Sequence, residues 1–193
     1  MRRAAVATAI LGLLLGCTPT PTVTTAAPTP TFACTPEAGG TPRPCSQAEY
    51  DAMVKKDALY AEAEALYRRL FAEEIRLDKL GGAKAATSEF EAILAGSLLE
   101  QTIAIHRENY ERGRRFTGTQ TLDWIRRAPG IETEGSLVAI IACRDATHGK
   151  TYEGKKYLGT GRAGTETVYA KHFDGQLKLF AVDSKELPTC DKA

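Results

Sequence analysis

The stretch that decides the fold is "SQAEYDAMVKKDALYAEAEALYRRLFAEEIRLDKLGG", which runs from Ser46 to Gly82. Ser46 is followed three residues later by Glu49, a pattern in which each side chain caps the other's backbone amide at a helix start. Apolar side chains then recur at steps of three, four and seven, at Leu59, Ala63, Leu66, Leu70 and Leu77, and the stripe is widened by Tyr60, Tyr67 and Phe71. Gly81 and Gly82 can supply the left-handed backbone of a helix end. We therefore predict one long amphipathic helix from Ser46 to Leu80.

Two shorter helices are predicted after it. Ser88 with Glu91 repeats the capping pattern and opens a short helix over "EFEAILAG". A third stripe marks another helix, which ends near Gly113; its members are Leu99, Ile103, His106 and Tyr110.

The periodicity changes from Phe116 onward. Four segments rich in β-branched and aromatic residues are predicted strands: "GTQTLDWIRR", "SLVAIIACRD", "ETVYAKHFD" and "GQLKLFAVDSK". Asp174 and Gly175 join the last two as a hairpin turn. Helices followed by a meandering antiparallel sheet indicate the α+β class.

The N-terminus predicts export and a membrane anchor. Arg2 and Arg3 precede an uncharged apolar run, Ala4 to Leu15, that is too short for a spanning helix of about 20 residues. This is the layout of a signal peptide. The sequence "LLGC", Leu14 to Cys17, resembles the bacterial lipobox, in which the cysteine takes a thioether-linked diacylglycerol and becomes the first mature residue. We predict a signal peptide over 1–16 and lipidation of Cys17 on the extracytoplasmic face of the cell membrane; the alternative is an ordinary secretory signal that leaves a soluble protein.

The segment after Cys17 is predicted to be a spacer. To about Phe32 it consists of Thr, Pro and Ala with almost nothing else and no charge, which cannot form a core. Extended at about 3.1 Å per residue, it could reach on the order of 50 Å. We assign residues 17–33 to this tether and residues 34–193 to one α+β domain.

The remaining four cysteines are predicted to form two disulfides, as expected for an exported chain. Cys34 and Cys45 bracket the turn-rich "TPEAGGTPRP" and are paired on that ground, which leaves Cys143 for Cys190. A zinc site is disfavoured because no Cys-x-x-Cys spacing occurs and the three histidines are scattered. No metal or cofactor is predicted.

Net charge argues against nucleic acid as a partner. The full chain has a formal charge of +1, and loss of Arg2 and Arg3 with the signal peptide would make it nearly neutral. Nucleic-acid binders usually show a basic excess.

The order of these features resembles the NTF2-like (SnoaL-like, cystatin-like α+β) superfamily, in particular its lipid-anchored members common in actinobacteria. The resemblance is carried by "LLGC", the helix from Ser46 to Leu80, and "LVAIIACRD" with Cys143 and Asp145. It implies a cone in which N-terminal helices pack on a curved antiparallel sheet around a pocket. Some members of that superfamily are enzymes, such as ketosteroid isomerases and polyketide cyclases, and many only bind ligands or partners, so the fold does not decide the function.

Two residues are weak candidates for catalysis. His106 lies on an apolar stripe, where it could be a base tuned by burial or simply a hydrogen-bonded residue at the edge of the core. Asp145 could pair with His148, although "DATHGK" has the composition of a turn. We therefore expect a non-catalytic module that is held on the membrane by its lipid and binds a small apolar ligand or an envelope protein. The alternatives are a cone enzyme of isomerase, cyclase or dehydratase type acting on a small apolar substrate, and an envelope structural or assembly factor.

Three other features, a glycine-rich segment, a tryptophan and a set of arginines, are expected to be structural rather than functional. "GTGRAG", Gly159 to Gly164, fits a phosphate-binding glycine pattern but precedes a predicted strand, so we expect a flexible loop. Trp124 is expected to pack against a helix. A set of arginines is expected to be solvated: Arg112, Arg114, Arg115, Arg126 and Arg127.

Overall fold

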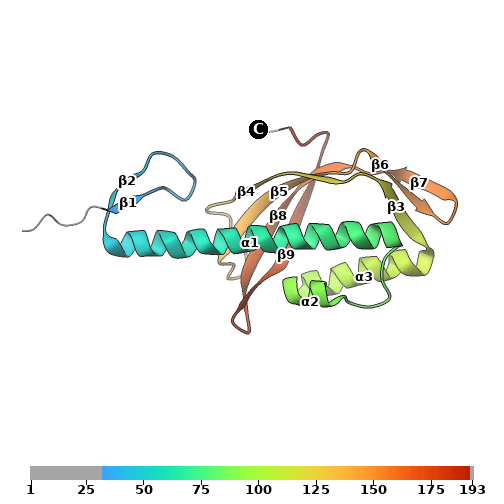
Figure 1. Ribbon diagram of the computed structural model, residues 1–193, viewed down its shortest axis with the longest axis horizontal. Coiled ribbons are helices and arrows are strands. Elements are labelled where there is room, and N and C mark those ends of the chain that lie inside the picture. The colour runs from blue at the N-terminus through green and yellow to red at the C-terminus, as the bar shows by residue number, and fades with distance from the viewer. Residues whose placement is uncertain (1–31, 192–193) are drawn as a thin grey trace, which may run out of the picture. The chain divides into compact units, whose positions relative to one another are not determined.

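A computed structural model describes residues 32–191 (Figure 1). Its elements, in chain order, are β1 (Phe32–Cys34), β2 (Arg43–Cys45), α1 (Gln47–Leu80), α2 (Ser88–Ile93), α3 (Gly96–Arg112), β3 (Arg114–Gly118), β4 (Thr121–Arg127), β5 (Val138–Asp145), β6 (Gly149–Glu153), β7 (Lys156–Thr160), β8 (Ala163–Phe173) and β9 (Gln176–Leu187). The described region is α+β, with α1 packed on antiparallel sheets, which confirms the predicted class.

Helix α1 begins and ends where the sequence predicts. The Ser46 amide donates to Glu49 Oε2 at 2.8 Å, and the Glu49 amide donates to Ser46 Oγ at 3.3 Å, so both halves of the capping box are present. Gly81 adopts the left-handed conformation at φ 89° and its amide donates to the Leu77 carbonyl. At 1.5 Å per residue, the 34 residues of this helix span about 50 Å.

The start of α2 and the buried face of α3 differ from the predictions. Thr87, not Ser88, caps α2, because its hydroxyl accepts a hydrogen bond from the Phe90 amide at 3.2 Å. The face of α3 that is buried consists of Leu98, Thr102 and His106, and Tyr110 is 45% exposed. Only His106 belongs to both the predicted and the observed stripe. Leu98 and Thr102 are buried in place of the predicted Leu99 and Ile103, each one residue earlier. Gly113 ends α3 as predicted.

The main sheet has the strand order β4-β5-β8-β9, with every neighbouring pair antiparallel. These strands contain the four predicted segments. Asp174 and Gly175 close the β8–β9 hairpin at φ 49° and 80°, the positive values that a tight two-residue turn requires. The predicted hairpin is confirmed.

A second sheet, of order β3-β6-β7, was not predicted. Its strands are short and rich in lysine, arginine and glycine, which weakens the β signal. Gly149 is required in β6, because a Cβ at that position would overlap the ring of Phe116 from β3. The sheet therefore depends on one glycine that makes room for an aromatic ring.

The glycine-rich segment Gly159 to Gly164 is mostly strand rather than the expected loop. It contains the end of β7 and the start of β8, joined through Gly161 and Arg162. Gly161 lies so close to Ala146 that a Cβ would meet the Ala146 carbonyl oxygen. The segment leads into β8 rather than into a helix, so the phosphate-binding arrangement is not formed.

The main core lies between the helices and the inner face of the main sheet. Side chains of α1, including Tyr67 and Leu70, pack with Ile140 of β5, Val168 of β8 and Leu179 of β9. Figure 1 shows α1 crossing this sheet with α2 and α3 beside its C-terminal half. Inner residues alternate with outer ones along β5, where Val138, Ile140 and Ala142 join the main core while Ala139 and Cys143 belong to separate clusters.

Candidate functional site

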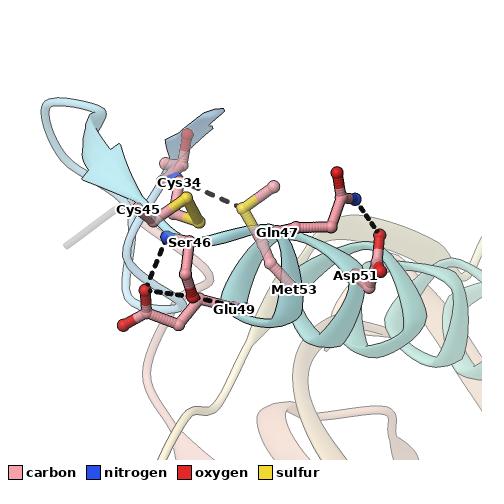
Figure 2. The surroundings of a disulfide bond; sticks show 8 residues. Cys34, Cys45, Ser46, Gln47, Glu49, Asp51 and Met53 are labelled. Carbon is pink, nitrogen blue, oxygen red and sulfur yellow. Dashed lines mark hydrogen bonds between the residues drawn. A yellow bond between two sulfur atoms is a disulfide. The ribbon is translucent and has the colours of Figure 1, made fainter. Parts of the chain in front are cut away.

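The disulfide between Cys34 and Cys45 joins β1 to β2 at the start of α1 (Figure 2). The two Cα atoms are 5.8 Å apart, as in ordinary disulfides. The Thr35 amide donates to Sδ of Met53 at 3.2 Å, so the bridged loop is also held to α1. Strand β1 begins at Phe32, so the last two residues assigned to the tether, Phe32 and Ala33, belong to this strand.

The second disulfide joins Cys143 of β5 to Cys190, with Cα atoms 5.7 Å apart. Both bridges agree with the predicted pairing. Trp124 packs on this second bridge together with Leu187, and its indole Nε1 donates to the Cys190 carbonyl at 3.1 Å. The expectation that Trp124 packs against a helix is therefore wrong, because its side chain secures the C-terminal segment instead.

The predicted anchor residue, Cys17, lies outside the described residues, as do the signal peptide and most of the tether. None of the helices within residues 32–191 is both long and apolar enough to cross a membrane. In the same residues, no three His, Cys, Asp or Glu side chains are grouped as metal ligands.

His106 is enclosed in the core rather than presented to a cavity. Its side chain is 5% exposed, and its ring lies 5.3 Å from that of Phe90. Its Nδ1 has no hydrogen-bond partner among the described residues. Burial lowers the pKa of His106 below its usual value, an effect that the Asp78 and Glu73 carboxylates oppose.

Asp145 is engaged in a local turn. Its Oδ1 accepts hydrogen bonds from the Thr147 amide at 2.7 Å and from the Thr147 hydroxyl at 2.6 Å. These bonds lower the pKa of Asp145, and His148 contributes only a smaller electrostatic effect. The structure does not bring Asp145 together with His106 in one pocket.

Four of the five arginines expected to be solvated have specific contacts. Arg112 and Arg114 both pair with Glu108 and Glu153. The other two are Arg127, which pairs with Asp57, and Arg126, which lies over the Trp124 ring at 4.5 Å.

The polar group that sequence reasoning missed is a charged cluster on the inner face of the main sheet, formed by Tyr67, Glu74, Arg144 and Glu166. Arg144 Nη1 lies 2.8 Å from Glu74 Oε2 and 3.1 Å from Glu166 Oε1. The Tyr67 hydroxyl donates to Glu166 Oε2 at 2.6 Å. The side chains of the three ionic members are only 18–22% exposed.

In this cluster, burial favours the neutral form of the Glu74 carboxyl group. Burial raises the pKa of Glu74 above its usual value, and the contact with Arg144 offsets only part of that effect. Glu74 Oε2 is fully enclosed and, despite its short distance to Arg144, is not in hydrogen-bonding geometry. Burial alone would lower the pKa of Arg144, but Glu74 and Glu166 together raise it, so the guanidinium stays charged.

A cavity of about 190 Å³ lies against this cluster, between α1, α3 and the sheet. Its polar lining comes from the cluster and from Gln101, Thr102 and Ser184. Its apolar lining consists of Leu70, Leu98, Ile105, Val168 and Val182. Gln101 and Ile105 are solvent-exposed residues of α3, so the cavity opens beside that helix.

Two larger hollows have a different character. One, of about 380 Å³, is lined mainly by residues with polar side chains, including Arg162 and Lys185, and it also touches Arg144 and Glu166. The other, of about 430 Å³, lies along the Cys34–Cys45 loop and includes Glu37 and Lys56. Neither hollow is lined by leucine, isoleucine or valine side chains, whereas the smaller cavity is, and we take the smaller cavity as the candidate site.

A signal for the cluster was present in the sequence. Arg144 alternates with Ala142 and Ile140 along a strand, and Glu166 precedes Val168 by two residues, so both fall on the apolar inner face. Tyr67 and Glu74 are seven residues apart and share one side of a helix. This pattern, with charged residues at inward positions of two strands and a helix, could have predicted that these side chains form one cluster in the core.

Comparison with known proteins gives no relative for this chain: no family model matches it, and no curated protein is similar to it. The function is therefore argued from the geometry.

Proposed function

We propose that this protein is a lipid-anchored extracytoplasmic binding protein whose folded region takes up a small, mainly apolar molecule without transforming it. The lipobox-like "LLGC" supports the anchor at Cys17. The two disulfides support an oxidising location outside the cytoplasm. Helices packed on the inner face of an antiparallel sheet are compatible with an NTF2-like cone.

The observation that carries the binding role is the cavity beside the Tyr67–Glu74–Arg144–Glu166 cluster. This cavity opens at the surface beside α3, and it combines apolar walls with a few convergent polar groups. That combination is typical of small-molecule sites.

Binding without turnover is favoured by the positions of the candidate bases. Neither His106 nor Asp145 lines the cavity, and each is occupied elsewhere, His106 against Phe90 and Asp145 in its turn. A general base must come within hydrogen-bonding reach of the proton that it removes. The cavity therefore has binding groups but lacks the two bases that the sequence suggested.

The test is to incubate the purified full chain with steroids, polyketides and cell-wall precursors while measuring both binding and product. Val182→Phe should fill the cavity and weaken binding at least about tenfold. Val54→Phe is the matched control, because Val54 is 46% exposed on α1 and does not line the cavity. Product formation that disappears in His106→Gln or Asp145→Asn would contradict the proposal.

A further inference from the structure

We propose that the cavity selects small molecules in which a cationic nitrogen, an ammonium or a guanidinium, is joined to an apolar body, with Glu74 and Glu166 as the groups that bind the cation. This inference rests on the proposed binding function and specifies the class of ligand.

The first argument is the charge of the lining. Two carboxylates, of Glu74 and Glu166, share a single guanidinium, that of Arg144, and both approach the same nitrogen, Nη1. No other arginine, lysine or histidine lines the cavity. Burial raises the pKa of Glu74 and favours its neutral form, whereas a cation bound beside it would favour the ionised form. With both carboxylates ionised, the lining carries one net negative charge. A buried charge without a full partner is costly, and a second cation in the cavity would remove that cost.

The second argument is that the single cation of the lining lies beside two carboxylates, which disfavours an anionic ligand. Arg144 is the single cation of the lining, and its Nη1 already faces both carboxylates. Its guanidinium carbon lies 4.9 Å from the centre of the Phe71 ring, so one face of the group is covered. An anion that approached Arg144 from the cavity would therefore come close to the Glu74 and Glu166 carboxylates, whose negative charges oppose it.

The third argument is the shape and chemistry of the remaining walls. Leu98 of α3 and Val168 and Val182 of the sheet belong to the apolar part of the lining. The volume of about 190 Å³ equals that of about six water molecules at about 30 Å³ each. The site therefore suits a compact molecule with one apolar ring or a short branched chain and a single charged end.

The experiment compares three probes of similar size on the full mature chain: benzylamine, benzyl alcohol and benzoate. At neutral pH they are a cation, a neutral molecule and an anion with the same ring. We expect benzylamine to bind at least about tenfold more tightly than benzyl alcohol, by calorimetry. It should also shift the methyl resonances of Leu98, Val168 and Val182, which locates the probe in the cavity.

Single substitutions test whether the Glu74 and Glu166 carboxylates cause the preference for the cationic probe. Glu74→Gln and Glu166→Gln should each reduce the amine-to-alcohol affinity ratio to less than about threefold. Glu89→Gln should leave the ratio unchanged, because Glu89 pairs with Arg69 at the surface and does not line the cavity. Circular dichroism checks that each variant is folded; if one is not, the ratio measured on the unchanged chain decides.

Two results would overturn the inference. If benzyl alcohol or benzoate shifts the same methyl groups and binds as tightly as benzylamine, the cation preference is wrong while the proposed binding function stands. If no probe shifts these methyl groups at millimolar concentration, the cluster is a structural ion-pair network, and the cation site is rejected. In that case the comparison of Val182→Phe with Val54→Phe on other molecules still decides the proposed function separately.

Discussion

His106 is a titratable group enclosed by apolar neighbours, with its Nδ1 unpaired among the described residues. The charged groups that affect it are Asp78 and Glu73 of α1 and Arg144 of β5. Burial dominates and lowers its pKa, so the folded chain binds a proton at His106 less readily than the unfolded chain does. The stability that depends on neutral His106 is complete above the unfolded pKa of about 6.5 and is lost as the pH falls from there toward the folded value.

We therefore predict that the free energy of unfolding decreases between about pH 7.5 and pH 5, and that part of this decrease is absent in His106→Gln. Each pH unit below the unfolded pKa can cost at most about 1.4 kcal/mol. At about pH 7.5 the substitution itself should cost about 1 kcal/mol. Urea unfolding at several pH values measures both effects.

His172→Gln is the control for this prediction, because His172 is exposed. It should reproduce the pH dependence of the unchanged chain. An identical pH dependence in His106→Gln would show that His106 takes up a proton equally readily in the folded and the unfolded chain, and would contradict the prediction.

At the residue scale, the sequence predicted the burial of side chains well, but it did not predict the hydrogen bonds that the buried polar groups make. Tyr67 was assigned to the apolar stripe, and it is fully buried, but its hydroxyl also donates to Glu166 from β8. That contact joins residues 99 positions apart, and strand pairing brings Glu166 beside Ala142 of β5. Periodicity identifies the face of an element, whereas contacts of this kind also require knowledge of which elements meet.

Helix α2 is an element whose start can be tested directly. Thr87 caps it through the Phe90 amide, whereas the sequence pattern favoured Ser88. Replacement of Thr87 by Ala should lower the free energy of unfolding by about 1 kcal/mol, because one amide of the first turn loses its acceptor. Chemical denaturation measures this loss.

Ser88→Ala is the matched control, since it removes a hydroxyl one residue later. It should change stability by less than about half of that amount. A larger effect from Ser88→Ala than from Thr87→Ala would contradict the assigned cap.

The Cys143–Cys190 bridge is predicted to be the more important of the two disulfides. It closes 47 residues, against 11 for Cys34–Cys45. In the loop-entropy model these bridges contribute about 4 and about 3 kcal/mol. The double replacement Cys143→Ala with Cys190→Ala should therefore lower the melting temperature further than Cys34→Ala with Cys45→Ala.

The surroundings of the two disulfides also indicate that Cys143–Cys190 contributes more to stability. Cys143 is completely buried in β5, where Trp124 and Leu187 pack around the bridge, whereas Cys34 and Cys45 lie in a small two-stranded sheet. Equal losses in calorimetry of the two double variants would contradict it.

At the element scale, local signals predicted α1 and the last hairpin correctly, but the same capping pattern placed the start of α2 one residue late, and weak β signals left one sheet unpredicted. The capping box and the two glycines fix α1, and Asp174 with Gly175 fixes the last hairpin. Strands β3, β6 and β7 depend instead on pairing with one another and on the fit of Phe116 over Gly149. Such a fit involves two segments that are distant in the sequence, so no local pattern reports it.

For the whole molecule, the location depends on Cys17. We predict that expression in a bacterium with a lipoprotein pathway yields a mature chain that begins at Cys17 and carries acyl groups. Mass spectrometry of the N-terminal peptide tests this directly. Two or more acyl chains would hold the protein stably at a membrane, whereas one chain gives only marginal binding.

Cys17→Ala is the variant for this test and should abolish the acyl mass and the membrane fraction. Recovery of an unmodified chain that starts at another residue would support the alternative of a secreted soluble protein.

The bridge beside the first turn of α1 also sets the path of mechanical force through the molecule. Tension applied to the chain ahead of Phe32 would pass from Cys34 across the sulfur atoms to Cys45 and directly into Ser46 and α1. Residues 35–44 lie outside this covalent path, and the hydrogen bond from the Thr35 amide to Met53 Sδ links them separately to α1. The helix would be pulled along its axis against lateral contacts such as Lys56 with the Leu137 carbonyl and Asp57 with Arg127. The force would thus act in shear on α1. Because the covalent path does not include the bridged loop, the loop could change in sequence or length without altering where force enters the fold.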